Sequence, residues 1–383
     1  MTTVAPDPET LAKPATFRPT YDDDAAPALP RPGLGKPTPD ERFSKIGSWL
    51  GALGLAWLVT QRLLPLEGLP WFLITWFVFG TVVGAVSAAM SGGIIDVKDR
   101  VAESVITATA LVVVAAVASA IVFVFSRGWK PLTHLNFVTD DMSGVGPKDG
   151  FEVGGILHAI VGSGIELGIA LLITLPLGIG TAVFMTEVGG RFAKVVRTVV
   201  EAMTALPSIV AGLFIYTVFI IALGTHGPGR SGLAASLAIS VMMLPIIARA
   251  ADVVLRVVPG GLREASLALG ASRWRTVWHV VLPTARPGLA TAVILGVARG
   301  VGETSPVLLT SGAAGFMVTN PTDGAMNSLP LFIYSTVRSG EPTAITRAFG
   351  AATVLLILVL VLFVTARLLA RQRTGPSRSR SKK

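Results

Sequence analysis

Two pairs of charged residues lie in otherwise apolar stretches, at the spacing of neighbours on one helix face. Arg299 and Glu303 are four residues apart, and Arg249 and Asp252 are three apart, so each pair can meet across one helical turn. A guanidinium group binds two oxygens of a phosphate or sulfate ion at once. Two arginines on adjacent helices therefore predict a path for an anion.

The position of each charged residue within its span determines how strong a functional candidate it is. A charged side chain at the centre of a membrane span costs about 2.5–3.5 kcal/mol on insertion scales, so such residues are default functional candidates. Arg299 lies about midway along a predicted span from 286 to 310, with glycines on either side. The alternative for Arg299 is a structural ion pair. Arg249 lies nearer the cytoplasmic face, where snorkelling to the interface is the alternative.

The elements that hold these residues are predicted from hydropathy. Of the 383 residues, 51% are hydrophobic and 14% charged, and the apolar ones cluster in runs of the roughly 20 residues that cross a bilayer as a helix. Backbone groups must be paired within lipid, so helices are the only plausible spanning structure. We predict an all-α polytopic membrane protein. Its spans, about eight, are expected at 47 to 64, 71 to 92, 101 to 126, 158 to 186, 198 to 223, 232 to 255, 286 to 310 and 348 to 370.

Charge distribution predicts the orientation. The net charge is +9, and the end of the chain carries seven basic residues and no acidic one between 367 and 383. By the positive-inside rule this tail is cytoplasmic, as are the basic loops on the same side, which also places the N-terminus in the cytoplasm. The basic tail favours contact with anionic lipid, and no nucleic-acid partner is expected.

Motifs for catalysis and cofactor binding are rejected. The stretch Gly227, Gly229, Gly232 fits a dinucleotide fingerprint, but it joins two predicted spans and contains Pro228, where a strand and a helix are required. The chain has no Walker-type phosphate loop, no cysteine, and four scattered histidines without metal-ligand spacing. We therefore expect no metal, no cofactor and no enzyme activity, and energy supplied by a partner or by a gradient.

A cytoplasmic loop between two spans is amphipathic and long for a connector. Glu264 to Leu269 are helix formers, Gly270 can adopt positive φ, and Ser272 can cap a second helix. Two short helices meeting at a glycine elbow are predicted. The second carries Trp274, Val277, Trp278 and Val281. An exposed apolar face there is suited to a groove of another protein, and the alternative is an interfacial helix pair lying on lipid.

The loop resembles the signature of bacterial ABC-importer permeases, which is Glu-Ala-Ala, three residues, Gly, nine residues, then Ile-x-Leu-Pro. The matching residues are Glu264, Ala265, Gly270, Leu282 and Pro283, with Ser266 in place of the second Ala and Val280 in place of Ile. The resemblance implies a MetI-like transmembrane domain whose coupling helix is held by a cytoplasmic ATPase subunit. ATP and Mg are then bound by that partner and not by this chain.

From about Lys98 to Leu369 the chain resembles more narrowly the phosphate-specific transport (Pst) permeases, particularly the PstA subunits of actinobacteria. The residues that carry this resemblance are Ala205 to Phe214, Met242 to Pro245 before Arg249, and Gly302 to Pro306. Small departures from the usual motifs occur at Ala205, Leu206 and Ser305. The substrate path implied for phosphate consists of Arg249, Asp252, Arg299, Glu303, Thr304 and Ser305.

The resemblance also implies partners, a location and a domain plan. The partners are a homologous permease subunit (PstC-like), a cytoplasmic ATPase dimer (PstB-like) and an extracytoplasmic phosphate-binding protein (PstS-like), all at the bacterial cytoplasmic membrane. The expected plan is a disordered cytoplasmic tail (1–45), an additional two-span hairpin (46–100), a first core span with an extracytoplasmic loop (101–155), a permease core (156–370) with the coupling loop 256–284, and a basic tail (371–383).

Three other functions remain open from the residues alone. Sulfate or molybdate is an alternative cargo, because the coupling loop is shared across substrates. A gradient-driven carrier or channel without an ATPase would also use intramembrane Arg and Glu. A cell-surface scaffolding protein is the third, although buried charges serve it poorly.

Overall fold

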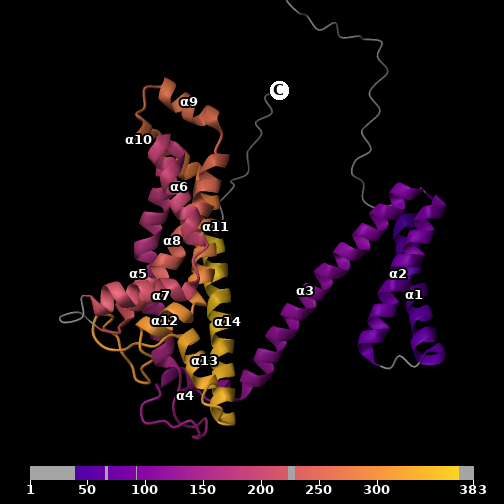
Figure 1. Ribbon diagram of the computed structural model, residues 1–383, viewed down its shortest axis with the longest axis horizontal. Coiled ribbons are helices and arrows are strands. Elements are labelled where there is room, and N and C mark those ends of the chain that lie inside the picture. Colours follow the sequence, from indigo (N-terminus) through magenta and orange to yellow (C-terminus); the bar gives the residue numbers. More distant parts are fainter. Residues whose placement is uncertain (1–38, 65–67, 92, 223–228, 371–383) are drawn as a thin grey trace, which may run out of the picture. The chain divides into compact units, whose positions relative to one another are not determined.

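The computed structural model describes residues 39–64, 68–91, 93–222 and 229–370, which are mostly helical (Figure 1). The all-α prediction is confirmed. The helices are α1 (Pro39–Leu58), α2 (Leu69–Ser91), α3 (Ile94–Leu132), α4 (Asn136–Thr139), α5 (Leu157–Val183), α6 (Gly190–Thr204), α7 (Ser208–Ile215), α8 (Gly232–Val257), α9 (Gly260–Ala268), α10 (Arg273–Thr276), α11 (Leu282–Val301), α12 (Ser305–Thr310), α13 (Leu329–Val337) and α14 (Pro342–Ala370). Four π-helical turns extend or join them: η2 (Val59–Leu63), η3 (Phe184–Val188), η4 (Tyr216–Ile221) and η5 (Val277–Val281).

Both predicted tails fall largely outside the described residues. Helix α1 begins at Pro39, so the last part of the segment 1–45 is helical and not disordered. The segment 1–38 and the basic tail 371–383 are not among the described residues, and their predicted disorder stays a prediction.

Six helices of the described residues are long and apolar enough to cross a membrane, or seven if one bent pair counts as a single span. The prediction of about eight spans is therefore too high. The segment 47–64 is not among the six, because glycine, serine, Gln61 and Arg62 dilute its apolar residues. The predicted spans at 158–186 and 232–255 coincide with α5 and α8 within three residues.

The predicted span at 198–223 is wrong as a straight helix. Helices α6 and α7 meet at an angle of 105°, and α7 runs across the bundle (Figure 1). The cause is Pro207, which lacks an amide proton and disfavours helical geometry at the preceding Leu206. A broken or re-entrant segment therefore takes the place of one span.

The chain divides into two compact units, Met1–Ala115 and Ala116–Lys383. In the first unit, α1 and α2 form an antiparallel hairpin in which the Trp76 indole N–H donates to the backbone oxygen of Trp49 at 3.0 Å. Gly80 lies against the Trp49 ring, where no side chain would fit. Lys45 and Glu103 form an ion pair within this unit.

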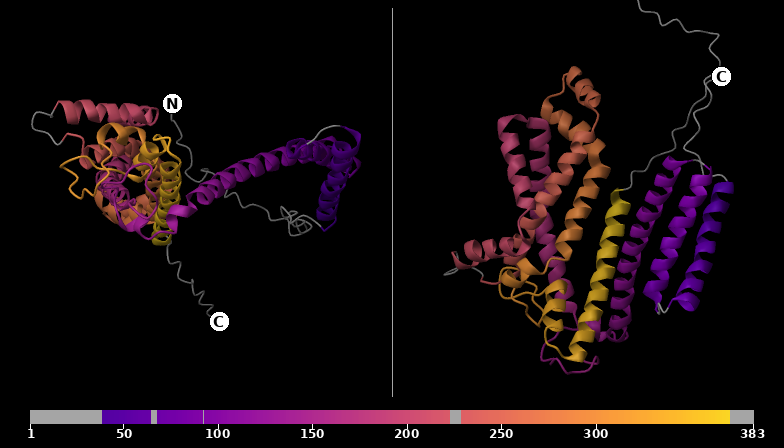
Figure 2. Two further views of the ribbon diagram at one scale, coloured as in Figure 1. Left: turned by 90° about the horizontal axis from the view of Figure 1, so that it is seen from below. Right: turned by 45° about the vertical axis from the view of Figure 1, so that its right-hand side comes forward.

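Small residues bring the central helices of the second unit into close contact. Helix α8 packs against α5 and α11, and a Cβ atom on Gly296 or Gly300 would meet Ile247 or Met243 of α8 at 2.5 Å. Gly178 of α5 approaches the same Ile247. Close approach of glycine faces is the usual way in which membrane helices gain packing energy. The result is a rigid group of three helices between the elbow at one end and the loops at the other (Figure 2).

The loops at the end opposite α9 are tied together by hydrogen bonds. Asp141 accepts from the backbone N–H groups of Ser143 at 3.0 Å and Met317 at 2.9 Å, and these bonds, that of Ser143 first, hold the pKa of Asp141 below its usual value. Arg347 is 1% exposed and donates to the backbone oxygens of Gly150 and Val153. These contacts hold the loops after α3 and α12 as one cap.

Gly162 offers a direct test of this packing. A Cβ atom there would overlap the backbone oxygen of Asn327, whereas Gly164, on the same helix, has open space around it. We expect Gly162→Ala to lower the free energy of unfolding by about 1–3 kcal/mol, because a backbone atom cannot move aside as a side chain can. The midpoint of thermal denaturation of the purified protein measures this. Gly164→Ala is the matched control, and an equal loss in both variants would contradict the packing described.

Candidate functional site

The predicted pairing of Arg299 with Glu303 is confirmed, with an Arg299 Nε to Glu303 Oε1 distance of 2.9 Å. The contact is close but is not aligned as a hydrogen bond. The two side chains differ in exposure, because 55% of the Arg299 side chain is accessible and only 6% of Glu303. A buried carboxylate thus holds an accessible guanidinium, whose remaining N–H groups are free of other described partners.

The predicted place of Arg299 midway along a span is wrong. Helix α11 ends at Val301, and Arg299 lies in its last turn. Gly302 ends the helix, and α12 begins at Ser305 with Pro306 in its first turn, a position at which a proline is well tolerated. The span predicted at 286–310 is therefore two helices. Arg299 therefore lies beside the break between α11 and α12.

The side chains of the two residues after Glu303 have surroundings that differ from those of Glu303. Thr304 is half-buried and lines a cleft of about 480 Å³ with Tyr334 and Arg338 of the α13 region. Ser305 is half-buried at the first position of α12. Their predicted contact with substrate stays a prediction, and the cleft beside Thr304 is the space in which it would occur.

Arg249 lies on a different side of α8 from the contact with α11. The side chains that meet α11 are Met243 and Ile247, and two further residues rotate the helix by about 200°. Arg249 is accordingly exposed and forms no ion pair with the described residues. Within one chain, Arg249 and Arg299 are thus placed on different surfaces, and their predicted common path remains a prediction.

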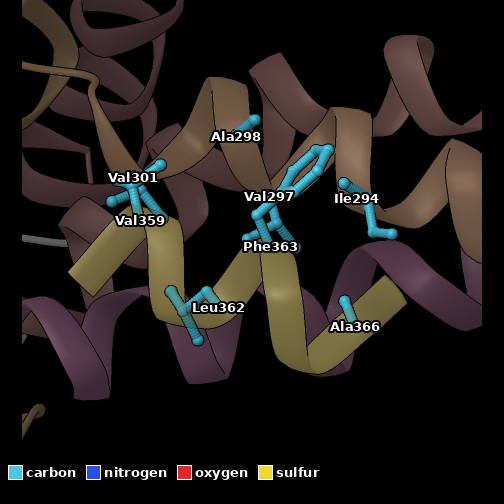
Figure 3. Close-up of a pocket in the computed structure, with 8 residues that line it drawn as sticks. All are labelled: Ile294, Val297, Ala298, Val301, Val359, Leu362, Phe363 and Ala366. Carbon is cyan, nitrogen blue, oxygen red and sulfur yellow. The ribbon is translucent and has the colours of Figure 1, made fainter. Parts of the chain in front are cut away.

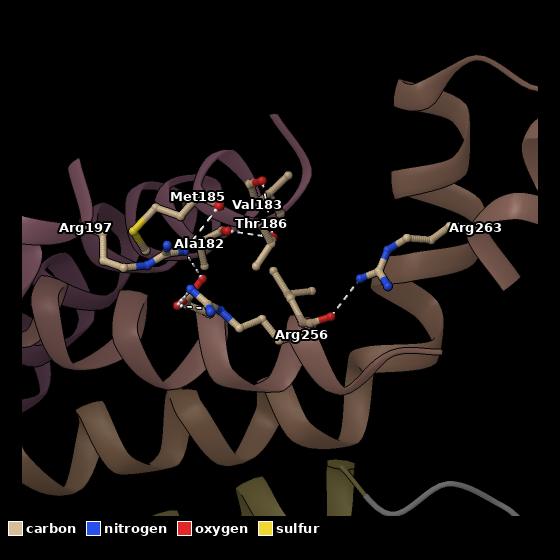
Figure 4. A network of polar contacts seen from close by, with 9 residues as sticks. Ala182, Val183, Met185, Thr186, Arg197, Arg256 and Arg263 are labelled. Atoms are coloured by element: carbon tan, nitrogen blue, oxygen red, sulfur yellow. Dashed lines mark hydrogen bonds and ion pairs between the residues drawn. The ribbon is translucent and has the colours of Figure 1, made fainter. Parts of the chain in front are cut away.

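Asp252 takes part in a polar network near the end of α8 with Arg197 and Arg256, which are labelled in Figure 4. It is 7% exposed, and its two oxygens accept from Arg197 and Arg256, each at 3.1 Å. Arg197 also donates to the backbone oxygen of Met185. Both oxygens are thus engaged by arginines other than Arg249. The role of Asp252 in the substrate path stays a prediction, and its observed role is to join α6 to α8.

Arg263 links the first turn of α9 to two other helices. It donates to Glu187 Oε1 from Nε at 3.1 Å and Nη2 at 2.9 Å, and to the backbone oxygens of Leu255 and Val258 at 2.8 and 2.6 Å. Glu187 belongs to η3, at the end of α5. Sequence reasoning missed this contact, because 76 residues separate its partners. Together with Arg197 and Arg256 these side chains border a polar pocket of about 440 Å³.

The glycine elbow is confirmed in its geometry and corrected in its extent. Gly270 has φ +82°, as predicted, and the Ser272 hydroxyl accepts from the backbone N–H of Arg275. The second helix is not short, however. It continues through η5 into α11, so that residues 273–301 form one helix that includes Leu282 and Pro283. The elbow is therefore the end of a membrane span.

Ser266 has a contact that its place in the signature did not indicate. Its hydroxyl lies 2.9 Å from the Thr276 hydroxyl and so joins the two arms of the elbow. Alanine, the residue usual in the signature, could not make this hydrogen bond. Glu264 and Ala265 are exposed on the outer side of α9.

The elbow presents apolar side chains to its surroundings. The most exposed is Leu269, at 90%. Trp274 and Trp278 pack edge to face and are also exposed, whereas Val277 and Val281, on the other side of that helix, are buried. The predicted apolar face therefore exists, and it is formed by leucines and tryptophans with the two valines turned inward.

A groove between α11 and α14 is excluded as a substrate site. It is lined only by apolar residues (Figure 3) and has a volume of about 20 Å³. A cavity of this size has room for about one water molecule and not for a phosphate ion. The groove is a packing seam beside Val301.

Taken together, the broken spans and the elbow define a membrane-embedded transport subunit. Residues 174–374 match the model of the family described as binding-protein-dependent transport system inner membrane component. The chain belongs to this family. It is therefore a multi-pass inner-membrane permease subunit of an ABC transporter and not itself the ATPase, as predicted.

The chain is similar to curated phosphate transport permeases. It is 38% identical over 247 residues to the phosphate transport system permease protein PstA 1 of Mycobacterium tuberculosis H37Rv, covering 64% of this chain and 79% of that protein. It is 40% identical over 237 residues to PstA of Mycobacterium leprae, covering 62% and 76%. A solved structure of the MetNI methionine ABC transporter matches with 24% identity and a TM-score of 0.44, covering 57% of this chain and 93% of that one.

Proposed function

We propose that this chain is the permease subunit of an ATP-driven importer that moves inorganic phosphate across the cytoplasmic membrane. The observation that carries the proposal is the accessible Arg299 guanidinium held by buried Glu303 at a break in a span. Similarity to the phosphate permeases of mycobacteria supports phosphate as the cargo. It makes sulfate, molybdate and a gradient-driven carrier weaker candidates.

Arg299 supplies the binding chemistry in this account. The Glu303 contact uses Nε and fixes the orientation of the guanidinium, which leaves the two terminal nitrogens for phosphate oxygens. Because Glu303 carries a negative charge, it also lowers the net charge of the empty site. When phosphate arrives, the carboxylate is an acceptor for a phosphate hydroxyl, which sulfate lacks.

Two structural connections link the elbow to the rest of the permease and can transmit its movement. One is the continuous helix of residues 273–301, which spans roughly 40 Å at 1.5 Å per residue and ends beside Arg299. The other passes from Arg263 to Glu187 at the end of α5. A displacement of the elbow by an ATPase subunit would therefore move both α5 and α11.

The partners follow from the family and from the exposed surfaces. A binding-protein-dependent transporter works with an ATPase and a binding protein. We propose that the ATPase, as a dimer, receives the elbow, that a phosphate-binding protein docks at the opposite end, and that a homologous permease subunit completes the path past Arg249. Anionic lipid contacts the basic residues of the elbow side, and both termini are cytoplasmic.

The linkage between elbow and α5 makes a testable prediction. Arg263→Gln and Glu187→Gln should each lower phosphate-stimulated ATP hydrolysis about ten- to hundredfold, because each removes a half-buried, charge-assisted contact worth about 1.5–3 kcal/mol. The double variant should be no worse than either single variant, since partners in one interaction are not additive. ADP release by the reconstituted complex measures this, and multiplicative losses would contradict the linkage.

Uptake by reconstituted vesicles tests the cargo. ATP-dependent entry of radiolabelled phosphate is expected when the complex contains this chain and a matching binding protein. A hundredfold excess of unlabelled sulfate should leave phosphate entry almost unchanged. Strong competition by sulfate, or entry without ATP, would sink the proposal in favour of another oxyanion or a gradient-driven carrier.

A further inference from the structure

A buried carboxyl group on α5 takes no part in the function proposed above. Glu166 is 1% exposed and lies about a third of the way along α5, within the predicted span 158–186. It forms no ion pair with the described residues. An ionised carboxylate in such surroundings would lose its hydration without gaining a cation, and buried acids avoid this state by keeping their proton.

The hydrogen bonds around Glu166 require one proton more than an ionised carboxylate offers. Ser311 Oγ lies 2.6 Å from Glu166 Oε1 and 2.8 Å from the backbone oxygen of Met326. A serine hydroxyl has one proton, and a carbonyl oxygen can only accept. If the Ser311 hydroxyl donates to Met326, the shorter contact needs a proton from the carboxyl group, which then donates to Ser311 Oγ.

The second carboxyl oxygen faces a cavity. Glu166 Oε2 and the Ser328 hydroxyl are both buried and neither makes a hydrogen bond of normal geometry with the described residues, but the Ser328 hydroxyl lies close enough to interact with the carboxyl group. Both residues line a cavity of about 390 Å³ between α5, α8, α11 and α14. This arrangement suits the carbonyl side of a carboxylic acid, which tolerates an unfilled acceptor better than a full negative charge does.

The other charged groups described near Glu166 do not neutralise its carboxyl group. Glu303 lines the same cavity but is paired with Arg299. His158, two turns earlier on α5, packs edge-on against Phe332. Arg230, close to Gly312, is exposed and lies over the Tyr216 ring. The two carboxyl groups of the cavity thus have different surroundings, one with a cation and one with hydroxyls.

We propose that Glu166 is a proton-binding site of this permease, in which the carboxylic acid donates to Ser311 Oγ and thereby fastens the segment after α12 to α5. The proton is bound in the conformation in which Glu166 and Ser311 are in contact. The same Ser311 pairs with Met326 through its backbone oxygen, which accepts from the Met326 N–H at 2.9 Å, so the fastening extends to the loop before α13. When this contact opens, the carboxyl meets water and releases the proton to it.

Infrared difference spectroscopy of the purified, assembled complex tests the proposal without phosphate transport, so its outcome is separate from that of the proposed function. At pH 7 the wild type should show the carbonyl band of a protonated carboxylic acid, shifted in heavy water. Glu166→Gln should remove this band, and Glu303→Gln should keep it. A wild type without the band, or a band that survives Glu166→Gln, overturns the proposal.

A second variant covers the case in which Glu166→Gln fails to assemble. Ser311→Ala keeps the carboxyl group and removes its acceptor, so the band should remain and move to the higher frequency of a weakly hydrogen-bonded acid. An unchanged frequency would show that Glu166 does not donate to Ser311 and would contradict the fastening. Where Glu166→Gln does assemble, its amide can donate to Ser311 in the same way, and its uptake should stay within about twofold of the wild type at pH 7.

Discussion

Phosphate uptake is expected to fall at least a hundredfold when Arg299 is replaced by glutamine. The variant removes the guanidinium at the helix break and leaves Glu303 buried without its cation. The variant loses the two charge-assisted hydrogen bonds proposed between the guanidinium and phosphate, which are worth about 1.5–3 kcal/mol each, and each 1.4 kcal/mol is a factor of ten. Initial rates of radiolabelled phosphate entry into vesicles measure the loss.

Three further variants separate binding from folding. Arg299→Gln combined with Glu303→Gln removes the unpaired charge, so the complex should assemble at least as well as with Arg299→Gln alone, while uptake stays lost. Arg299→Lys keeps the charge without the two-pronged geometry and should lose about tenfold. Arg286→Gln, an exposed arginine near the start of α11, should transport normally. Normal uptake by Arg299→Gln would refute the assignment.

Reversal of the charge at the elbow is expected to disconnect ATP hydrolysis from transport. Glu264 is exposed on α9, beside the apolar residues that the elbow presents. A like charge placed in an interface costs several kcal/mol. Glu264→Lys should therefore abolish uptake and reduce phosphate stimulation of ATP hydrolysis to the basal rate, with the ATPase subunit partly lost on purification.

The milder change Glu264→Gln should have a smaller effect on coupling. It removes the charge without reversing it, so uptake should be intermediate between that of the wild type and of Glu264→Lys. Gel filtration of the complex reports whether the ATPase subunit remains bound. If Glu264→Lys keeps full coupling, the elbow does not receive the ATPase subunit as proposed.

The sequence alone was sufficient to predict the elements that depend on residues close together along the chain. The long apolar runs of α5 and α8 predicted their bounds within three residues, and Gly270 predicted the turn of the elbow. The pairing of Arg299 with Glu303 followed from helical spacing alone. These features depend on residues that are neighbours along the chain, so no knowledge of the packing was needed.

Breaks within apolar stretches could not be predicted from hydropathy. Averaging over a window does not register Pro207 or Gly302, although each interrupts a helix. The error moved Arg299 from the last turn of α11 to the middle of a span. The prolines alone would not have identified the breaks, because Pro176 and Pro245 lie inside the continuous helices α5 and α8.

Contacts between distant segments were beyond the sequence for a different reason. Arg197 and Asp252 are 55 residues apart, and Arg263 and Glu187 are 76 apart. Their pairing depends on how α5, α6 and α8 pack. Glu166, by contrast, could have been noticed, because a lone acid within an apolar run is a functional candidate by default.

The most direct test of the account is to measure phosphate entry and ADP release together in vesicles that contain the whole complex and its binding protein. The account predicts that both rates rise with external phosphate, that external sulfate raises neither, and that Arg299→Gln loses both responses while the complex stays assembled. ADP release that ignores external phosphate, or undiminished phosphate entry in Arg299→Gln, would contradict it.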